Sequence, residues 1–185
     1  MTMLRFVRGD LFESKAQTLV NTVNCAGVMG KGVALAFKRR YPEMYEKYRQ
    51  QCERGETQIG ILTLYTDTQP WIINFPTKRH WRSRSRLKYI EAGLKYLVQH
   101  YKEWGITSLA MPALGCGHGG LDWSEVRPLI ERYLGDLDID IEVYEPGNQA
   151  SLPDKTPEMD ASPAEQTDLF GEPVKPAKPK RKPRR

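Results

Sequence analysis

The sequence has few cysteines, few histidines and no long apolar run. Its 185 residues include three cysteines and three histidines, and Cys25, Cys52 and Cys116 lie far apart without a CxxC pair. This scatter argues against a disulfide scaffold and a zinc site, and it is typical of a reducing compartment. No apolar stretch approaches the roughly 20 residues that a membrane-spanning helix needs. We therefore expect a cytoplasmic protein that uses no metal or cofactor and does not contact a membrane.

Charge and composition divide the chain into two parts. The formal net charge is +5, which favours anionic partners such as nucleic acid. Apolar periodicity is strong up to Gly147, and the residues after it are rich in Pro, Lys, Arg, Glu and Asp. Such a segment cannot bury enough apolar surface to offset the entropy lost on ordering. We predict a monomeric domain over residues 1–147 and a disordered tail over residues 148–185.

Short β-rich runs alternate with longer amphipathic runs along the domain. The pattern predicts strands over residues 3–9, 18–24, 59–66, 70–77, 108–114 and 139–146. It predicts helices over residues 30–55, 86–105 and 123–135, the first divided at Tyr41 because Pro42 is typical of a helix start. Apolar strands that alternate with helices indicate an α/β fold whose sheet is covered on both faces.

A first glycine-rich loop, NCAGVMGKG, follows the strand predicted over residues 18–24. Gly27, Gly30 and Gly32 lie just before a helix, where free backbone N–H groups and the positive end of the helix dipole favour an anion. The loop is neither a Walker A loop nor a GxGxxG fingerprint. It is either a phosphate-binding loop or a flexible entry to the helix, and taken alone it does not decide between the two.

A second glycine-rich loop, PALGCGHGGLDW, follows the strand predicted over residues 108–114. Gly115, Gly117, Gly119 and Gly120 lie within six residues, and Asp122 is the expected N-cap of the next helix. Two such loops at the carboxyl ends of strands indicate one crevice that grips a diphosphate. The pair of loops therefore favours a nucleotide-like ligand.

A basic stretch, NFPTKRHWRSRSR, begins as an apolar strand and ends as a charged loop. Lys78 lies where the strand ends, and Arg79, His80 and Arg82 follow. One interpretation is an ordinary exposed lysine that contacts phosphate, and on the residues alone it is the favoured one. The other is a nucleophilic amine whose pKa, about 10.4 in a free lysine, is lowered towards 7–8 by burial and nearby cations.

Three of these motifs together resemble the macrodomain family of ADP-ribose-binding modules. They are the Gly9–Asp10 pair, VNTVN with its glycine-rich loop, and MPALGCGHGGLDW, and the resemblance covers about residues 1–145. It implies a three-layer α/β/α sandwich with a mixed central sheet. The wording VNTVNCAGVMGKGVALAFK together with IINFPTKRHWRSRSRL is similar to the DarG branch, bacterial antitoxins that remove ADP-ribose from DNA after the partner toxin DarT has attached it to thymidine. The resemblance thus implies an ADP-ribosyl glycohydrolase acting on single-stranded DNA.

The resemblance also implies roles for individual positions. Asp10 would accept a hydrogen bond from the adenine amino group, and Lys78 would be the catalytic lysine. Relatives have an acidic residue two positions after GCG, where this chain has Gly119. His118 is therefore the candidate for the second catalytic group; the alternative is that it is a structural or solvent-facing loop histidine. The implied ADP-ribose contacts are Gly9, Asp10, Leu11, Asn21, Thr22, Asn24, Gly30, Lys31, Gly32, Val33, Thr77, Leu114, Gly115, Cys116, Gly117 and Gly119.

The basic loop and the tail suggest further partners. Basic side chains beside an aromatic ring suit single-stranded DNA, although a charge run is also compatible with a solvated surface; the predicted DNA contacts are Arg79, His80, Trp81, Arg82 and Arg84. The tail motif QTDLF, with Gln166, Leu169 and Phe170 as anchors, resembles the pentapeptide that docks on the bacterial sliding clamp. DarG antitoxins typically carry a second, C-terminal domain that binds the toxin. We expect this sequence to be either a truncated piece of such a protein or a stand-alone macrodomain, so a toxin partner stays open.

Two alternatives to the DNA hydrolase remain at this point. The first is a module that binds ADP-ribose without catalysis. The second is a hydrolase of protein-linked ADP-ribose. Both stay open because each of these functions would use the same ADP-ribose-binding residues. The role of Lys78 distinguishes the binding module from a hydrolase. Only a comparison of substrates distinguishes a hydrolase of protein-linked ADP-ribose from a DNA hydrolase.

Overall fold

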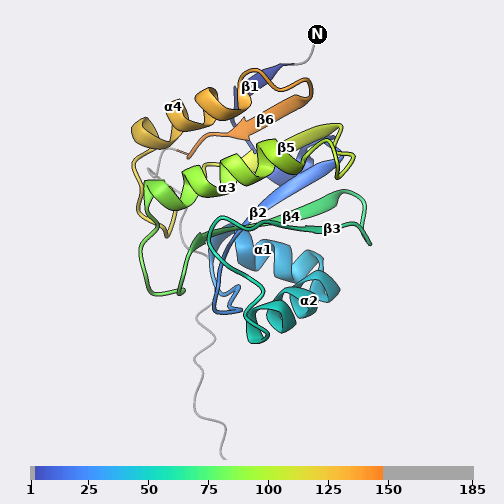
Figure 1. Ribbon diagram of the computed structural model, residues 1–185, viewed down its shortest axis with the longest axis vertical. Coiled ribbons are helices and arrows are strands. Elements are labelled where there is room, and N and C mark those ends of the chain that lie inside the picture. Colours follow the sequence, from blue (N-terminus) through green and yellow to red (C-terminus); the bar gives the residue numbers. More distant parts are fainter. Residues whose placement is uncertain (1–2, 148–185) are drawn as a thin grey trace, which may run out of the picture. The chain divides into compact units, whose positions relative to one another are not determined.

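The computed structural model describes residues 3–147, and Figure 1 shows their arrangement. The predicted tail over residues 148–185, with Gln166, Leu169 and Phe170, lies outside the described residues and stays a prediction. Within the described part, no helix is long and apolar enough to cross a membrane. No group of three or more His, Cys, Asp or Glu residues that could hold a metal ion occurs there either.

Six strands form one mixed sheet in the order β1-β6-β5-β2-β4-β3. The β3–β4 pair is antiparallel and the other neighbours are parallel, so the predicted mixed sheet is confirmed. The strands are β1 Leu4–Val7, β2 Thr18–Asn24, β3 Thr63–Tyr65, β4 Trp71–Lys78, β5 Ser108–Pro112 and β6 Asp140–Tyr144. The helices are α1 Gly32–Arg40, α2 Pro42–Glu53, α3 Leu87–His100 and α4 Trp123–Leu134.

Alternate residues of the central strands face two separate hydrophobic cores. Val20 of β2 and Ile73 of β4 pack in the core formed with α3 and α4, whereas Leu19 of β2 and Ile72 of β4 pack in the core formed with α1 and α2. Successive side chains of a strand point to opposite faces, so apolar runs need cover on both sides. Figure 1 shows α3 and α4 on one side of the sheet and α1 and α2 on the other, which confirms the three layers.

Most predicted elements occur, with two differences. The first helix is divided at Tyr41, and Pro42 opens α2 as expected. The strand predicted over residues 59–66 shortens to Thr63–Tyr65, because Gly60 has a φ of 82° and the Ile61 N–H closes a turn on the Gln58 carbonyl. A 3-10 helix, η1 Leu11–Glu13, was not predicted.

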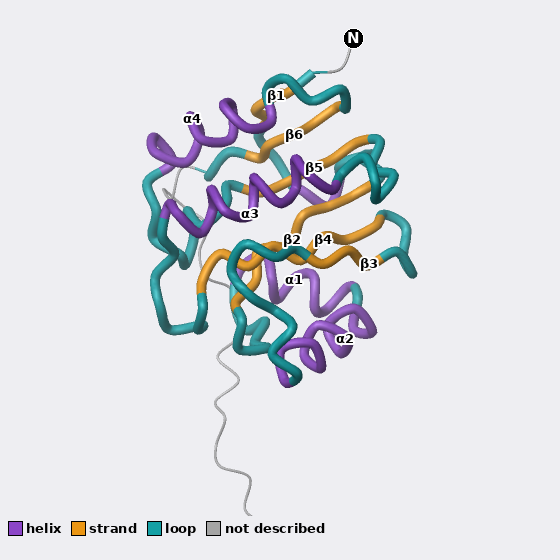
Figure 2. The backbone as a smooth tube through the Cα atoms, in the orientation of Figure 1, coloured by secondary structure: helices purple, strands orange, loops and turns teal. Residues whose placement is uncertain are grey.

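The parallel strands carry their functional loops at one edge of the sheet. Their carboxyl ends lead into the segment Arg8–Asp10 after β1, the first glycine-rich loop after β2, the basic loop after β4 and the second glycine-rich loop after β5. In Figure 2 the long teal loops that follow β4 and β5 lie on the left-hand side of the view. In open α/β sheets, ligands bind outside the carboxyl ends of the strands. This edge is therefore the place to look for the site.

Candidate active site

A backbone link fastens the first glycine-rich loop to the end of β4. The Cys25 N–H donates to the carbonyl oxygens of both Lys78 and Arg79, at 3.2 and 3.1 Å. A bulge precedes this link: Val23 pairs with Pro76 but Asn24 pairs with Lys78, so Thr77 is an extra residue in β4. Bulges re-aim side chains and are frequent beside active sites. Here the bulge places Lys78 next to the loop that was predicted to hold the diphosphate.

Lys78 is partly buried, and its ammonium group is held by the basic loop. Its Nζ donates to the Trp81 carbonyl oxygen at 3.1 Å. Burial lowers the pKa of Lys78 from its ordinary value of 10.5, because loss of solvent penalises the charged amine. The prediction that Arg79, His80 and Arg82 also lower this pKa is wrong, since burial is the only cause; the three side chains are exposed, where water screens their charge.

The structure places several predicted ligand residues in the interior. Asn21 is fully buried, and its amide donates to Asn74 Oδ1 at 3.1 Å. Thr77 is 4% exposed, and its hydroxyl donates to the Val23 carbonyl at 3.5 Å. The sequence-based ribose contacts of Asn21 and Thr77 are therefore not supported. Leu11 and Leu114 pack in the two cores, so a ligand would meet only the main chain of these residues.

Asn24 shapes the first glycine-rich loop. Its amide nitrogen donates to the Val28 carbonyl at 2.7 Å, and its Oδ1 accepts from the Ala26 N–H at 2.9 Å. The buried Tyr48 hydroxyl also donates to the Asn24 carbonyl at 2.6 Å. These short-range hydrogen bonds satisfy main-chain groups that are no longer paired with a neighbouring strand after β2 ends. The loop that follows presents Gly30, Lys31 and Gly32 as exposed residues.

The helix α1 begins at the end of this loop without a side-chain cap. Its N-cap Lys31 makes no capping hydrogen bond, and no acidic residue lies in the first turn. The first N–H groups of a helix and its dipole attract anions. Gly32 has a φ of 57°, a left-handed conformation that glycine adopts readily. Gly30, Lys31, Gly32 and the partly buried Val33 are thus placed where a diphosphate contact is chemically reasonable.

The second glycine-rich loop is tightly folded on itself. The Leu121 N–H donates to the Gly115 carbonyl at 3.0 Å, and the Gly120 N–H donates to the Gly117 carbonyl at 3.1 Å. Gly115 has a φ of 72°, and a Cβ there would lie 2.8 Å from Leu121. Cys116 is half-buried and its pKa is raised to about 11, chiefly by burial, so its thiol stays neutral. Gly117 is exposed and remains available to a ligand.

His118 is where the two glycine-rich loops meet. A Cβ built on Gly32 would lie 3.2 Å from His118 Cδ2, so the imidazole covers the start of α1. No hydrogen bond joins His118 to Lys78 in the described part of the chain. The structure thus brings His118 into the crevice, and a catalytic role for it stays a prediction.

Gly119 cannot carry the acidic side chain of the relatives in this backbone. A Cβ built on Gly119 overlaps with Ser85 Oγ and with the Gly115 carbonyl oxygen. Gly119 is buried, and its own carbonyl accepts from the Ser85 N–H at 3.0 Å, which argues against its predicted diphosphate contact. Asp122 is the N-cap of α4 as predicted and accepts from the Ser124 N–H at 2.8 Å. Ser85, which supports this arrangement, gave no signal in the sequence.

Asp10 and Gly9 lie at the far end of the site, after β1. Asp10 Oδ1 caps η1 by accepting from the Phe12 N–H at 2.9 Å. Its second oxygen makes no hydrogen bond within residues 3–147 and stays available to an adenine amino group. Gly9 has a φ of 131°, and a Cβ there would meet the Tyr144 ring at 4.0 Å.

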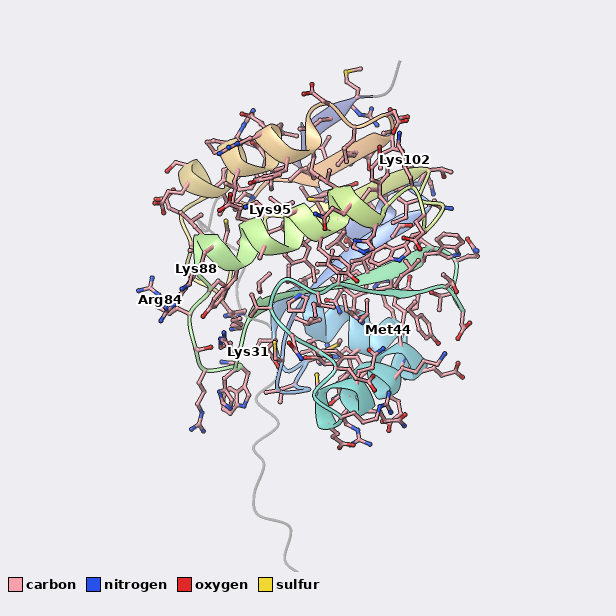
Figure 3. All side chains as sticks on the ribbon, in the orientation of Figure 1. Lys31, Met44, Arg84, Lys88, Lys95 and Lys102 are labelled. Atoms are coloured by element: carbon pink, nitrogen blue, oxygen red, sulfur yellow. The ribbon has the colours of Figure 1, made fainter. Side chains whose placement is uncertain are left out.

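The basic loop is exposed and joins the second glycine-rich loop. Trp81 is 43% exposed, with the Arg82 guanidinium 4.3 Å from its ring centroid and the His80 ring at 5.3 Å. Arg84 donates to the Gly120 carbonyl at 3.1 Å. No ion pair in the described residues involves Arg79, Arg82 or Arg84. Figure 3 shows Lys31, Arg84 and Lys88 towards the same left-hand side of the view, and this unpaired positive charge suits a polyanion.

Comparisons with known proteins identify the family of this chain. Residues 20–130 match the family model of the Macro domain. The chain belongs to the macrodomain family. It is 52% identical over 149 residues to the DNA ADP-ribosyl glycohydrolase of Thermus aquaticus, covering 78% of this chain and 41% of that protein. It is 30% identical over 142 residues to the human ADP-ribose glycohydrolase OARD1, covering 76% of this chain and 90% of that protein.

Solved structures show the same fold. The macrodomain of Thermus aquaticus DarG superimposes with a TM-score of 0.76 at 50% identity, over 79% of this chain and 100% of that chain. Thermosipho africanus DarTG in complex with ADP-ribose gives a TM-score of 0.77 at 43% identity, over 83% of this chain and 44% of that chain. The chain spans 41–42% of the length of the first three curated relatives.

Proposed function

We propose that this macrodomain removes ADP-ribose from thymidine bases in single-stranded DNA, with Lys78 as the nucleophile. The observation that carries the proposal is the amine of Lys78, partly buried at the end of β4 beside the first glycine-rich loop, with a pKa that burial lowers. The names of the similar proteins, DNA ADP-ribosyl glycohydrolases among them, support the choice of DNA as the substrate.

ADP-ribose is proposed to lie along the carboxyl edge of the sheet. Asp10 receives the adenine amino group, and Gly30–Val33 with Gly115 and Gly117 hold the diphosphate through main-chain N–H groups, whereas the Cys116 N–H already donates to the Ala113 carbonyl at 3.1 Å. Thr22, near the carboxyl end of β2, is proposed to face the ribose, whereas the 5% exposed Asn24 side chain is bonded to Val28 and Ala26 and shapes the loop instead. The distal ribose then reaches Lys78, and the exposed side chains after it, Trp81, Arg82 and Arg84 with His80, contact the DNA strand.

The chemistry needs a neutral amine. The Lys78 Nζ lone pair forms a bond to the anomeric carbon of the distal ribose while the bond from that carbon to the base nitrogen breaks. The bonding electron pair leaves on the base nitrogen, which gains a proton, and the attacking amine loses one. Water then attacks the same carbon and the bond from that carbon to Nζ breaks; the leaving nitrogen gains one proton and the attacking water loses one, which restores the neutral lysine. His118, beside Gly32, is the group proposed to accept the proton of that water.

The substrate implies an enzyme that makes it. A DarT-type DNA ADP-ribosyl transferase is the proposed source, because attachment to thymidine must precede removal. One similar protein, from Thermosipho africanus, is a fusion of a DNA ADP-ribosyl transferase and a DNA ADP-ribosyl glycohydrolase. Its name supports a pairing of the two reactions.

Substitution of the lysine tests the proposal. Lys78→Ala should reduce release of ADP-ribose from a modified thymidine oligonucleotide to the uncatalysed level, while the Kd for free ADP-ribose changes less than about threefold, because the diphosphate and adenine contacts remain. Lys95→Ala is the matched control: Lys95 is an exposed lysine paired with Glu91 on α3, and such surface pairs contribute little.

Two results would replace the proposal with an alternative. Full turnover by Lys78→Ala would remove the lysine from the mechanism. A wild-type protein that binds ADP-ribose but releases none from DNA would be a binding module, or a hydrolase of protein-linked ADP-ribose if it acts on a modified protein instead. Modified DNA and a modified protein should therefore be assayed side by side, together with binding of free ADP-ribose.

A further inference from the structure

A cavity separate from the glycine-rich crevice lies beside the residue that follows Lys78. Its volume is about 230 Å³, and it is lined by Cys25, Thr57, Gln58, Ile59 and Arg79. Two of these residues belong to the backbone link described above, because the Cys25 N–H donates to the Arg79 carbonyl. The other three come from the loop between α2 and β3. The cavity is smaller than the roughly 300–1,000 Å³ of a pocket for a whole drug-sized ligand, so it suits one small group.

One of the residues that line this cavity, Thr57, has a buried hydroxyl without a partner. Thr57 is 6% exposed, and its Oγ1 makes no hydrogen bond. Buried polar groups in native proteins nearly always have a partner, and an exception calls for a missing ligand or water. Thr57 therefore has an unused hydrogen-bonding hydroxyl in the wall of this cavity.

The charges around the cavity select an anion. The Arg79 guanidinium has no ion-pair partner in residues 3–147; it lies 5.9 Å from the Tyr89 ring centroid, and its contact with the Tyr89 hydroxyl lowers the pKa of that group. No carboxylate lines the cavity. Burial raises the pKa of the Cys25 thiol, so this wall carries no negative charge. The Gln58 amide nitrogen is already bound to the Gly55 carbonyl at 3.1 Å.

We propose that this cavity binds a phosphodiester of the DNA strand that carries the ADP-ribose, with Arg79 and Thr57 as its hydrogen-bond donors. This inference rests on the proposed function. Arg79 directly follows the nucleophile, so a strand whose modified base is at Lys78 passes the cavity with its backbone. Contacts to phosphate fix the register of a nucleic acid without reading its sequence. Thr57 and Arg79 thus position the strand so that the modified base meets the amine.

Two substrates separate a phosphodiester contact from every other effect. One is ADP-ribosylated thymidine as a free nucleoside, which lacks DNA phosphates, and the other is a short oligonucleotide with the same modification. Arg79→Gln should lower kcat/KM on the oligonucleotide at least about tenfold more than on the nucleoside, the effect of losing a charge-assisted hydrogen bond. Thr57→Val, which keeps the side-chain shape, should produce a selective loss of about three- to tenfold.

A control variant tests whether Arg79 acts only through general electrostatic attraction of the DNA. Arg54→Gln removes one positive charge from the loop between α2 and β3, which also contains Thr57. Arg54 pairs with Glu56 at 2.6 Å and does not line the cavity. For single strands, one lost phosphate contact lowers the slope of log K against log salt by about 0.7. Only Arg79→Gln should show this change in oligonucleotide binding, measured in the Lys78→Ala background. Equal effects of Arg54→Gln and Arg79→Gln would overturn the assignment.

Single uncharged methylphosphonates in the oligonucleotide locate the contact. At one position next to the modified thymidine, the replacement should weaken wild-type binding as much as Arg79→Gln does, and it should add nothing to that variant. Effects that add at every position would refute the cavity as a DNA subsite, because independent sites are additive. Competition by inorganic phosphate that depends on Arg79, without any methylphosphonate effect, would also refute it in favour of a free anion. Wild-type failure on both modified substrates would refute the proposed function alone, since the binding measurements still decide the cavity.

Discussion

Replacing Gly119 by alanine tests whether the second glycine-rich loop is packed as described. A Cβ at this position overlaps with Ser85 Oγ and with the Gly115 carbonyl oxygen. Ser85 is 5% exposed, so its hydroxyl has little room, and the carbonyl belongs to a loop closed by the hydrogen bond from Leu121. Overpacking of this kind costs about 1–3 kcal/mol.

The opposing effect is smaller. Replacing glycine by alanine restricts the unfolded chain and stabilises by about 0.4–1 kcal/mol where the native backbone accepts it. The net loss for Gly119→Ala is therefore about 1–2 kcal/mol, which lowers Tm by roughly 3–8 °C in a domain of this size. Thermal unfolding followed by circular dichroism measures it.

Gly117→Ala is the matched control for this substitution. It lies two residues away in the same loop, and a Cβ on it meets nothing within 4 Å, so Tm should be unchanged or slightly higher. Gly119→Asp, which would restore the acid of the relatives, meets the same overlap and should destabilise without raising activity. A Gly119→Ala protein as stable as Gly117→Ala would refute the packing argument.

Two further predictions concern titration. Because burial lowers the pKa of Lys78 and attack needs the neutral amine, kcat should rise with pH and inflect below 10.5, as measured by release of ADP-ribose from a modified oligonucleotide; an inflection at 10.5 or above would contradict this. Hydrogen bonds from Ser124 lower the pKa of Asp122 below 3.8, so the stability that this cap adds is complete above that pH and is lost as pH falls through the lowered pKa. Asp122→Ala should therefore reduce Tm at pH 7, and the difference from wild type should shrink in acid; a constant difference would contradict the cap.

The sequence predicts the layers well because periodicity reports burial. The runs around Leu19 and Ile72 are apolar on both faces, and the structure packs both faces. Proline and cap signals are local, so Pro42 and Asp122 open their helices as expected. The shortening of β3 depends on a turn closed between Gln58 and Ile61, which leaves little trace in a β-rich run.

The site was predicted less completely, for reasons of tertiary contact. Asn21 and Thr77 have polar side chains at the right sequence positions, but pairing with Asn74 and the bulge in β4 turn them inward. Ser85 is bonded to Gly119, and Thr57 lines a cavity with Arg79, in each case across loops distant in sequence. The cations after Lys78 were expected to tune its amine, yet their charges face water. None of these outcomes follows from residue type and spacing alone.

The bond from the Cys25 amide to the carbonyls of Lys78 and Arg79 joins main-chain groups only, and this limits what mutagenesis can test. Both partners of the link are peptide groups, so no side-chain replacement at these three positions deletes it. An alanine scan would therefore miss a connection that ties the anion-binding loop to the proposed nucleophile and to the floor of the neighbouring cavity. Exchange of the Cys25 amide for an ester by chemical synthesis removes this donor; it also weakens the Asn24 carbonyl as the acceptor of the Tyr48 hydroxyl, so Tyr48→Phe is the control for that second effect. Such a backbone substitution tests whether ADP-ribose affinity and the position of the Lys78 amine depend on the same link.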